Sequence, residues 1–375
     1  MSNEQGIRRV FVRVHERRYD KPSRNPHVRW DAKYAVLAFV ETYGGVLGVG
    51  EAWCDSASLR SVISLIEEDL APAVTGLPVS MPESLWHEMM RREPMNLRGA
   101  ALYAAASAVD IAVWDAFAKG ANLPLYRLLG GFRDSVPVYG SAGLYRDDYG
   151  PGDLARDMAG AMERGCFGVK IKVAGASIAE DVARASAVRE AIGPEAALMV
   201  DALFAPTVPQ AIALGRDLSP FGILFFEAPT DRRNPHGWEE IASATGLSLS
   251  GPEVEAGLDR FETFARITGL HYLQADAIIC GGMTEMRRIA SLASAMHRQM
   301  TVHCSGSGVA FAANACAAAA FSSGHSVELH LLHQSLYDRV WDAGYRVGEG
   351  ALTLSDRPGL GLEIEPDDHG LQRTG

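Results

Sequence analysis

The hydrophobic and polar positions follow one pattern in the first third of the chain and a different one in the rest. In the first third, Val10–Val14 alternates apolar and polar side chains, as a half-buried strand does, and Tyr34–Glu51 contains two strand-like runs around a hairpin signal. Apolar positions at helical spacing follow over Leu59–Leu70 and Ala101–Lys119. Strands followed by helices predict an α+β domain over residues 1–135.

A polar stretch, Tyr19–Trp30, interrupts this domain and contains Pro22 and Pro26. The composition predicts a long loop. Long loops in compact domains are often functional, for example as lids. A mobile surface connection is the alternative, and the residues themselves favour neither interpretation.

From residue 136 onward, short apolar runs alternate with helix-like stretches. Eight runs are strand candidates, and each precedes a helical pattern, which predicts an α/β fold with a (β/α)-barrel over residues 136–340. The runs are Val136–Gly140, Gly168–Val173, Ala197–Val200, Ile223–Phe226, Leu247–Ser250, Tyr272–Leu273 continuing into Ala277–Ile279, Met300–Val302 and Val327–Leu332.

Ionisable residues recur where these strands end. Their spacing corresponds to one strand–helix repeat each, with successive separations from Lys170 of 31, 26, 26, 23, 27 and 25 residues. A barrel gathers the C-terminal ends of its strands at one mouth, where active sites lie. We therefore expect one site containing Lys170, Lys172, Asp201, Glu227, Glu253, Asp276, His303 and Glu328.

The two lysines lie two positions apart in a strand pattern, so Lys170 and Lys172 share one face. Two nearby ammonium groups lower each other's pKa, and a lysine with a lowered pKa is a usable general base. Lysine-x-lysine is a common sequence, and a solvated strand face is the alternative.

Three carboxylates, those of Asp201, Glu227 and Glu253, directly follow successive strand candidates. Unpaired, they would repel one another, whereas a bound hard cation would hold them together, and oxygen ligands favour Mg²⁺. Taken singly, Asp201 is also explained as a helix N-cap and the two glutamates as exposed loop residues. Glu255 lies on the same face as Glu253, although Glu253 follows the strand more directly.

His303 ends one strand and Asp276 ends the strand before it. A carboxylate beside an imidazole fixes its tautomer and raises its basicity, so the pair predicts an acid/base dyad. The alternative for His303 is a hydrogen-bonded core histidine. Glu328, on the last strand, is the weakest member of the set, and a half-buried carboxylate at a surface-facing strand end is an alternative only slightly less favoured than a functional role.

The composition argues against nucleic-acid and membrane partners. The formal net charge is −11 and no basic stripe stands out, which argues against nucleic acid. The five cysteines form no CxxC pair and indicate reduced thiols in the cytoplasm. The N-terminus lacks the apolar run of a signal peptide, and Val309–Phe321 is too short to span a bilayer, so no membrane partner is expected.

The order lysine-x-lysine, Asp, Glu, Glu, Asp, His, Glu on successive strands resembles the mandelate racemase subgroup of the enolase superfamily, over nearly the whole chain. Several phrases are also similar to that family: YAVLAFVETYGGVLGVGEAW (Tyr34–Trp53), GVKIKV (Gly168–Val173), LMVDA (Leu198–Ala202), FFEAP (Phe225–Pro229), DAIICGGMTE (Asp276–Glu285) and DRPGLGLEI (Asp356–Ile364).

The resemblance implies a modified (β/α)7β TIM-type barrel capped by the α+β domain, with residues 341–375 returning to the cap and the Tyr19–Trp30 segment closing over the site. It implies a homo-oligomer and a small carboxylate substrate. It also implies roles for the site residues. Asp201, Glu227 and Glu253 would bind Mg²⁺. Lys172 would be the base on one face of the substrate, and Lys170 would contact the substrate carboxylate and depress the pKa of Lys172. His303, with Asp276, would be the acid/base on the opposite face, and Glu328 would hydrogen-bond the substrate carboxylate as it becomes an enediolate.

Two positions depart from the family pattern. Leu203 stands where many members have an Asn that binds the substrate's α-hydroxyl, and leucine offers no hydrogen bond. Pro252 stands where Gly is more usual, directly before Glu253. Leu203 therefore points to an altered substrate.

Three functions fit these residues. The first is dehydration of an acid sugar to a 2-keto-3-deoxy acid, with His303 protonating the departing hydroxyl. The second is a racemase or epimerase, in which Lys172 and His303 exchange roles. The third is a non-catalytic barrel that keeps the metal ligands, which the presence of every base and ligand disfavours.

Overall fold

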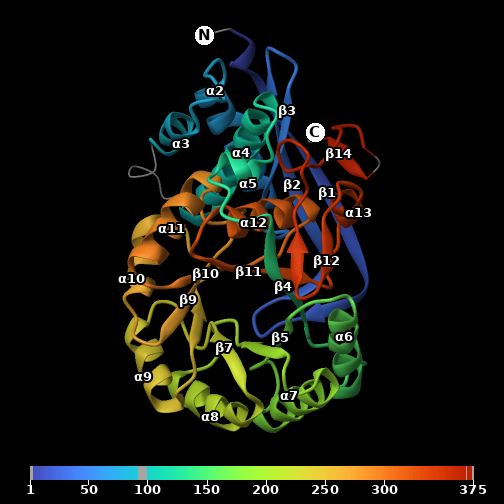
Figure 1. Cartoon of the computed structure of the whole chain (residues 1–375), viewed down its shortest axis with the longest axis vertical. Helices are drawn as coiled ribbons and strands as arrows, with labels where there is room; N and C mark the ends of the chain where they lie inside the picture. Colours follow the sequence, from blue (N-terminus) through green and yellow to red (C-terminus); the bar gives the residue numbers. More distant parts are fainter. Residues whose placement is uncertain (1–2, 92–98, 369, 374–375) are drawn as a thin grey trace.

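The computed structural model describes residues 3–91, 99–368 and 370–373. Figure 1 shows a barrel of parallel strands below and a smaller layer of strands and helices above it, with both ends of the chain in the upper layer. The upper layer is the cap.

The cap is an antiparallel sheet covered by helices. Its strands run in the order β14-β1-β2-β3: Leu371–Arg373, Ile7–Arg24, Arg29–Thr42 and Leu47–Ala52. The helices are η1 (Asn3–Gln5), α1 (Leu59–Ser64), the π-helical η2 (Leu65–Leu70), α2 (Ala71–Val74), α3 (Pro82–Met90) and α4 (Gly99–Gly120). The helical patterns expected over residues 59–70 and 101–119 are therefore present.

Helix α4 packs unusually close to strand β3. A Cβ on Gly48 would lie 2.0 Å from the carbonyl oxygen of Ala112, and one on Gly50 would lie 2.1 Å from that of Ala108. Only glycine allows this approach. In the part of the chain that the structure describes, α4 is the one helix long and apolar enough to cross a membrane, but 78% of its most apolar stretch is buried inside the protein, as in a core helix.

The barrel has eight parallel strands, β4 to β11, and closes because β11 pairs with β4. This confirms the predicted fold class. The strands are Ser135–Ala142, Gly168–Lys172, Ala197–Asp201, Ile223–Glu227, Leu249–Gly251, Leu270–Ala275, Gln299–Val302 and Gly324–His330. The short hairpin of β12 (Arg346–Gly348) and β13 (Ala351–Thr353) extends the sheet beyond β4.

Helices connect and cover these strands: α5 (Leu125–Leu128), α6 (Pro151–Glu163), α7 (Ile178–Ile192), α8 (Val208–Leu218), η4 (Ser219–Phe221), α9 (Pro235–Thr245), α10 (Leu258–Ala265), α11 (Met283–Ala295), α12 (Gly308–Ala320) and α13 (Tyr337–Asp342). One predicted strand is wrong in extent. Strand β9 ends at Ala275, and residues 277–279 form a turn whose amides hydrogen-bond back to Asp276 and Asn314.

No long loop exists over residues 19–30, which corrects the prediction made from its prolines and polar composition. Strand β1 continues to Arg24 and β2 begins at Arg29, so only a tight turn separates them. The Asn25 carboxamide oxygen accepts hydrogen bonds from the backbone N–H groups of His27 and Val28, at 2.8 and 2.7 Å, and so fixes the turn. The register slips between Arg18 and Ser23, the interval that contains Pro22.

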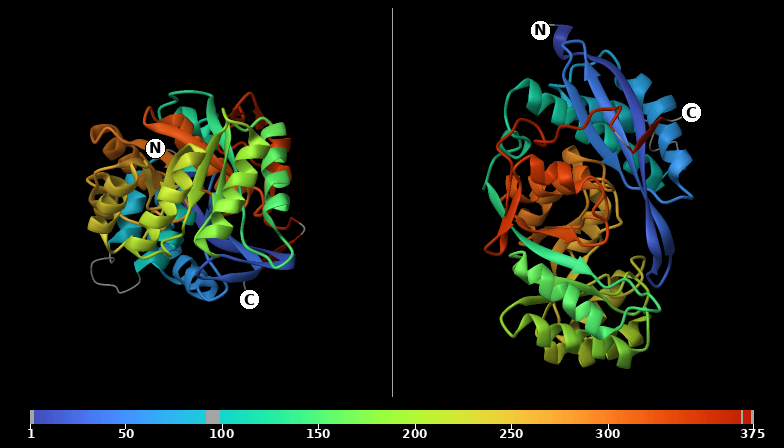
Figure 2. Two further views of the ribbon diagram at one scale, coloured as in Figure 1. Left: turned by 90° about the horizontal axis from the view of Figure 1, so that it is seen from below. Right: turned by 90° about the vertical axis from the view of Figure 1, so that its right-hand side faces the viewer.

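This hairpin tip extends beyond the cap sheet and lies against the barrel (Figure 2, right). Arg24 and Tyr145 exchange two backbone hydrogen bonds of 3.0 and 2.8 Å. Lys21 forms an ion pair with Asp148. The hairpin, residues 19–30, therefore joins the cap to the loop that follows β4.

Candidate active site

The carboxyl ends of the barrel strands bring all the predicted site residues to one place. Each is at most 8% exposed. Lys170 and Lys172 lie on β5, Asp201 ends β6, Glu227 ends β7, Glu253 follows β8, Asp276 follows β9, His303 follows β10 and Glu328 lies on β11.

Asp201, Glu227 and Glu253 form an acidic triad. One carboxylate oxygen of each lies within 4.8 Å of those of the other two. Both oxygens of Glu253 are buried and without a hydrogen-bond partner. Burial and the neighbouring Asp201 raise the pKa of Glu253 to about 7, and they raise the pKa of Glu227 well above its ordinary value. Buried, close and unsatisfied oxygens of this kind fit a bound divalent cation.

Glu255 does not compete for this role. It forms ion pairs of 2.9 Å with both Arg232 and Arg260, and these hold its pKa below the ordinary value against the effect of burial. The choice of Glu253 as the third member of the triad agrees with this geometry.

The two lysines bind the carboxylates around them. Lys170 Nζ lies 2.8 Å from both oxygens of Glu227 and 3.2 Å from Glu328 Oε2. Lys172 forms an ion pair with Asp201. Burial lowers the pKa of both lysines, and Lys170 lowers that of Lys172, but the carboxylates outweigh these effects and hold both pKa values above the ordinary value. The expectation of a lowered lysine pKa is therefore wrong for the metal-free site.

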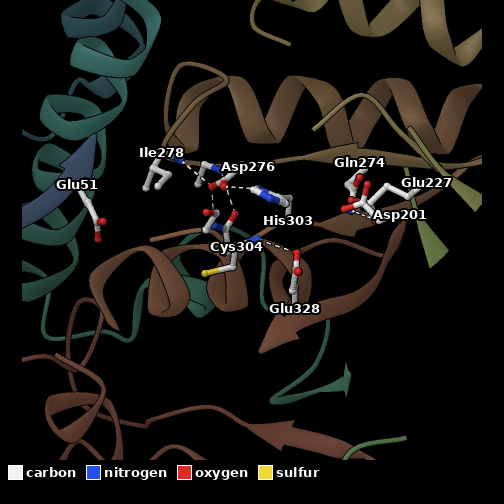
Figure 3. A network of polar contacts seen from close by, with 12 residues as sticks. Glu51, Asp201, Glu227, Gln274, Asp276, Ile278, His303, Cys304 and Glu328 are labelled. Atoms are coloured by element: carbon white, nitrogen blue, oxygen red, sulfur yellow. Dashed lines mark hydrogen bonds and ion pairs between the residues drawn. The ribbon is translucent and has the colours of Figure 1, made fainter. Parts of the chain in front are cut away.

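His303 and Asp276 form the expected dyad (Figure 3). His303 Nδ1 lies 2.8 Å from Asp276 Oδ2. The other oxygen of Asp276 accepts from Asn314 Nδ2 at 2.8 Å and from the N–H of Ile278 at 3.1 Å. These bonds keep Asp276 in place and make Nδ1–H the donor, which leaves Nε2 of His303 as the free base.

Asn314 was missed by the sequence interpretation. It is the single amide in α12, a helix whose thirteen residues are all buried. A polar side chain at such a position needs a partner, and that was the available signal.

Glu328 and Gln274 are hydrogen-bonded to the lysine and carboxylate groups of the site. Glu328 Oε2 accepts from Lys170 and from the N–H of Cys304, each at 3.2 Å, whereas its Oε1 is buried without a partner. Burial raises the pKa of Glu328, but Lys170 and His303 outweigh it and hold the pKa well below its usual range. Gln274, also missed, donates to Glu227 at 3.0 Å.

An aromatic wall formed by Tyr19, Trp30, His330 and His333 lies where the hairpin meets β11. Tyr19 Oη is 2.5 Å from His333 Nδ1, the His330 and His333 rings stack at 4.0 Å, and Trp30 contacts His333 edge-on. Burial lowers the pKa of His330 to about 3 and that of His333 well below the ordinary value, so both rings are neutral at pH 7. The sequence interpretation had Tyr19 and Trp30 only as the ends of the segment expected to close over the site, and it named neither histidine.

Leu203 takes part through its backbone. Its N–H donates to Asp201 Oδ1 at 2.8 Å, and its carbonyl oxygen lies 2.7 Å from His27 Nε2 on the hairpin. Its φ of +51° is rare for leucine. This residue therefore connects a triad carboxylate to the hairpin.

Comparisons with known protein families agree with this geometry. Residues 8–130 match the model described as mandelate racemase / muconate lactonizing enzyme, N-terminal domain, and residues 153–368 match the enolase C-terminal domain-like model.

Individual relatives span nearly the whole chain. The arabinonate dehydratase of Saccharolobus solfataricus is 31% identical and covers 88% of each chain. The D-galactarolactone cycloisomerase of Agrobacterium fabrum is 30% identical over 95% of this chain and 96% of its own. A racemase from Streptomyces coelicolor, solved with bound magnesium, superposes with a TM-score of 0.87 at 28% identity, covering 96% of this chain and 97% of its own.

Proposed function

Because the chain belongs to the mandelate racemase / muconate lactonizing enzyme family of the enolase superfamily, we propose that it dehydrates an acid sugar in a Mg²⁺-dependent reaction. The reaction begins with removal of the proton α to the substrate carboxylate. The observation that carries this proposal is the placement of Lys172 and the His303–Asp276 dyad on opposite sides of one barrel mouth that also holds the acidic triad.

The two proton-transfer groups approach from different directions. Around the closed barrel, β5 with Lys172 and β10 with His303 are three strands apart one way and five the other. Lys172 takes the α-proton from one face of the substrate. His303, through Nε2, gives a proton to the departing 3-hydroxyl, and the product is a 2-keto-3-deoxy acid.

The residues fit a divalent cation because Glu253 has two buried oxygens without partners beside Asp201 and Glu227. When bound, Mg²⁺ supplies positive charge that stabilises the enediolate. Lys170 and Glu328, which lie 3.2 Å apart beside the triad, contact the substrate carboxylate. With the triad engaged in metal binding, Asp201 would no longer hold the pKa of Lys172 up, and Lys172 would be available as a base.

Racemisation or epimerisation is the second candidate, because the same two groups on opposite faces would exchange one proton. The solved relative described as a racemase supports it. The curated relative described as arabinonate dehydratase, at 31% identity, favours dehydration.

The test is incubation of the purified protein with Mg²⁺ in D₂O against a library of acid sugars and simpler α-hydroxy acids, followed by proton NMR. A 2-keto-3-deoxy product establishes dehydration. Loss of the α-proton signal without a new product indicates racemisation or epimerisation instead. Silence across the library, with metal bound, contradicts both, and Lys172→Ala and His303→Asn are the controls for any signal seen.

Two further proposals concern the protein's surroundings. All five cysteines are buried free thiols, which fits a reducing compartment, and we keep the cytoplasm as the proposed location. We also propose a homo-oligomer, which light scattering coupled to gel filtration would test.

A further inference from the structure

Lys33 brings a positive charge from the cap to the mouth of the barrel. It lies on β2, and its Nζ is 3.4 Å from Ser305 Oγ and 5.1 Å from the centre of the Trp53 ring. Ser305 is two residues past His303. The ammonium group therefore lies beside the dyad, on the cap side of the site.

Lys33 differs from the two barrel lysines because no carboxylate neutralises it. Lys170 has three carboxylates within 4.0 Å and Lys172 has one. Among the residues that the structure describes, no carboxylate oxygen comes within 4.0 Å of Lys33. Its partners are a long hydrogen bond to a hydroxyl and an aromatic face, and burial lowers the pKa of its ammonium group although Glu51 and Asp276 act in the opposite direction.

The nearest acidic side chains are already occupied. Glu51 accepts hydrogen bonds from the Ser307 hydroxyl at 2.5 Å and from the N–H groups of Ser307 and Ala310, where α12 begins. Asp276 is saturated by His303, Asn314 and Ile278. Neither can turn to Lys33 without leaving a buried donor unpaired, so the charge is left for a ligand.

The other groups on this side supply no competing charge. His330 and His333 are neutral at pH 7, because burial lowers the pKa of each. Arg24 reaches instead to the carbonyl of Gly175, and Lys21 is paired with Asp148. Lys33 is thus a cation on the cap side of the site that is not held by a carboxylate, whereas Lys170 is bound to Glu227 and Glu328.

We propose that Lys33 binds a second carboxylate, at the far end of the substrate, and that the protein prefers sugar diacids over monoacids. This inference rests on the proposed function. A partly desolvated ammonium without a counter-ion is unfavourable, and a carboxylate satisfies it with a charge-assisted hydrogen bond that a hydroxymethyl group cannot match. Family membership alone does not decide the point, because arabinonate has one carboxylate and galactarolactone derives from a diacid.

Binding and turnover are measured separately, so that the two proposals fail separately. Calorimetry of the Lys172→Ala variant with Mg²⁺ measures affinity for pairs of sugar acids that have the same configuration at every carbon and differ only in a terminal carboxylate or hydroxymethyl group. Turnover of the same pairs by the otherwise unaltered enzyme reports the proposed function.

We expect the tightest ligand to be a diacid. In the Lys33→Met background its affinity falls roughly 10- to 100-fold, to that of the matched monoacid, whose own affinity changes little. Lys33→Arg keeps a cation and retains part of the preference. Arg8→Met, which removes an exposed cation at the start of β1 in the cap, keeps all of it.

Equal affinity for diacids and monoacids, an equal loss for both in Lys33→Met, or no diacid binding at all would overturn the role of Lys33. Circular dichroism and the Mg²⁺-induced thermal shift verify that each variant is folded with its metal site intact. A diacid preference that depends on Lys33 in a protein without turnover would support the inference while contradicting the proposed reaction.

Discussion

His303 Nδ1 lies 2.8 Å from Asp276 Oδ2, and this one contact decides which nitrogen of the ring is left for the substrate. A carboxylate only accepts, so Nδ1 carries the hydrogen and Nε2 carries the lone pair. Asn314 and the Ile278 amide prevent Asp276 from rotating away.

Replacing Asp276 by Asn is expected to reverse this tautomer. The amide nitrogen would donate to Nδ1 and the hydrogen would move to Nε2, so the ring could no longer hold a proton on both nitrogens, as it must before Nε2 protonates the departing hydroxyl. We expect kcat to fall on the order of 100-fold or more, with Mg²⁺ binding retained. Steady-state kinetics at saturating Mg²⁺ measure the fall in kcat. Asp110→Asn is the matched control, since Asp110 is also buried but binds Thr284, and a comparable loss there would show a general packing effect.

Removing one triad carboxylate is expected to abolish the stabilisation by metal. Adding Mg²⁺ at about 100 times its Kd should raise the free energy of unfolding by about 2.7 kcal/mol, and Glu253→Gln should lose most of that gain. Thermal denaturation with and without Mg²⁺ measures this stabilisation in each variant. Glu255→Gln, two residues away but paired with two arginines, should keep the full response. If both variants respond alike, Glu253 is not a ligand.

The metal-free protein should lose stability as pH rises. The Glu253 carboxyl has a pKa of about 7 when folded and an ordinary value near 4.5 when unfolded. Between these values the folded chain holds the extra proton, so its stability falls from about pH 4.5 to about pH 7 and then levels. Urea denaturation in EDTA at several pH values measures the slope. A slope unchanged in Glu253→Gln would assign it to other groups.

Replacing Leu203 by Asn should stabilise the chain locally. Leucine at φ +51° carries a steric cost on the order of 1 kcal/mol, and asparagine tolerates this conformation better. We expect the free energy of unfolding to rise by up to about 1 kcal/mol, whereas Leu203→Ala keeps the strain. Denaturant titration distinguishes them. The Asn variant should also lower KM for α-hydroxy acids, since it adds a hydrogen-bonding group beside Asp201.

Tyr19→Phe should weaken closure of the hairpin more than the chemistry. It removes the hydrogen-bond partner of Nδ1 in the buried His333 ring, at a cost of about 1–3 kcal/mol. KM is expected to rise several-fold with a smaller change in kcat. Tyr43→Phe, which changes an exposed residue of the cap, should leave KM and kcat unchanged. A fall in kcat alone would place Tyr19 in proton transfer instead.

The sequence predicted the barrel and its chemical residues because one ionisable side chain recurs per strand–helix repeat. Glu253 and Asp276 each lie just past a strand, where such groups are expected to converge. Residues supplied by the cap escaped notice because they have no fixed spacing relative to the barrel. Lys33 is one polar position in an alternating strand, and only the packing of cap on barrel places it beside Ser305.

The prolines of the hairpin led to the wrong prediction of a long loop over residues 19–30, and the structure gives a physical reason. Pro22 lies in the interval where the β1–β2 register slips, so its missing N–H interrupts the pairing without ending the strand. The lysine pKa was misjudged because each ammonium's carboxylate neighbours lie on other strands, at distances that period-two alternation does not reveal.

The hairpin is held down at several points along its length, by Arg24 on Tyr145, Lys21 on Asp148, Tyr19 on His333 and His27 on Leu203. We expect substrate entry and product release to require these contacts to break. Each catalytic cycle therefore includes two passages through an opened form, and the frequency of that opening sets a ceiling on turnover however fast the proton transfers are. Raising the solvent viscosity would then lower kcat in the steady state, but it would not change the rate of a single turnover of substrate that is already bound.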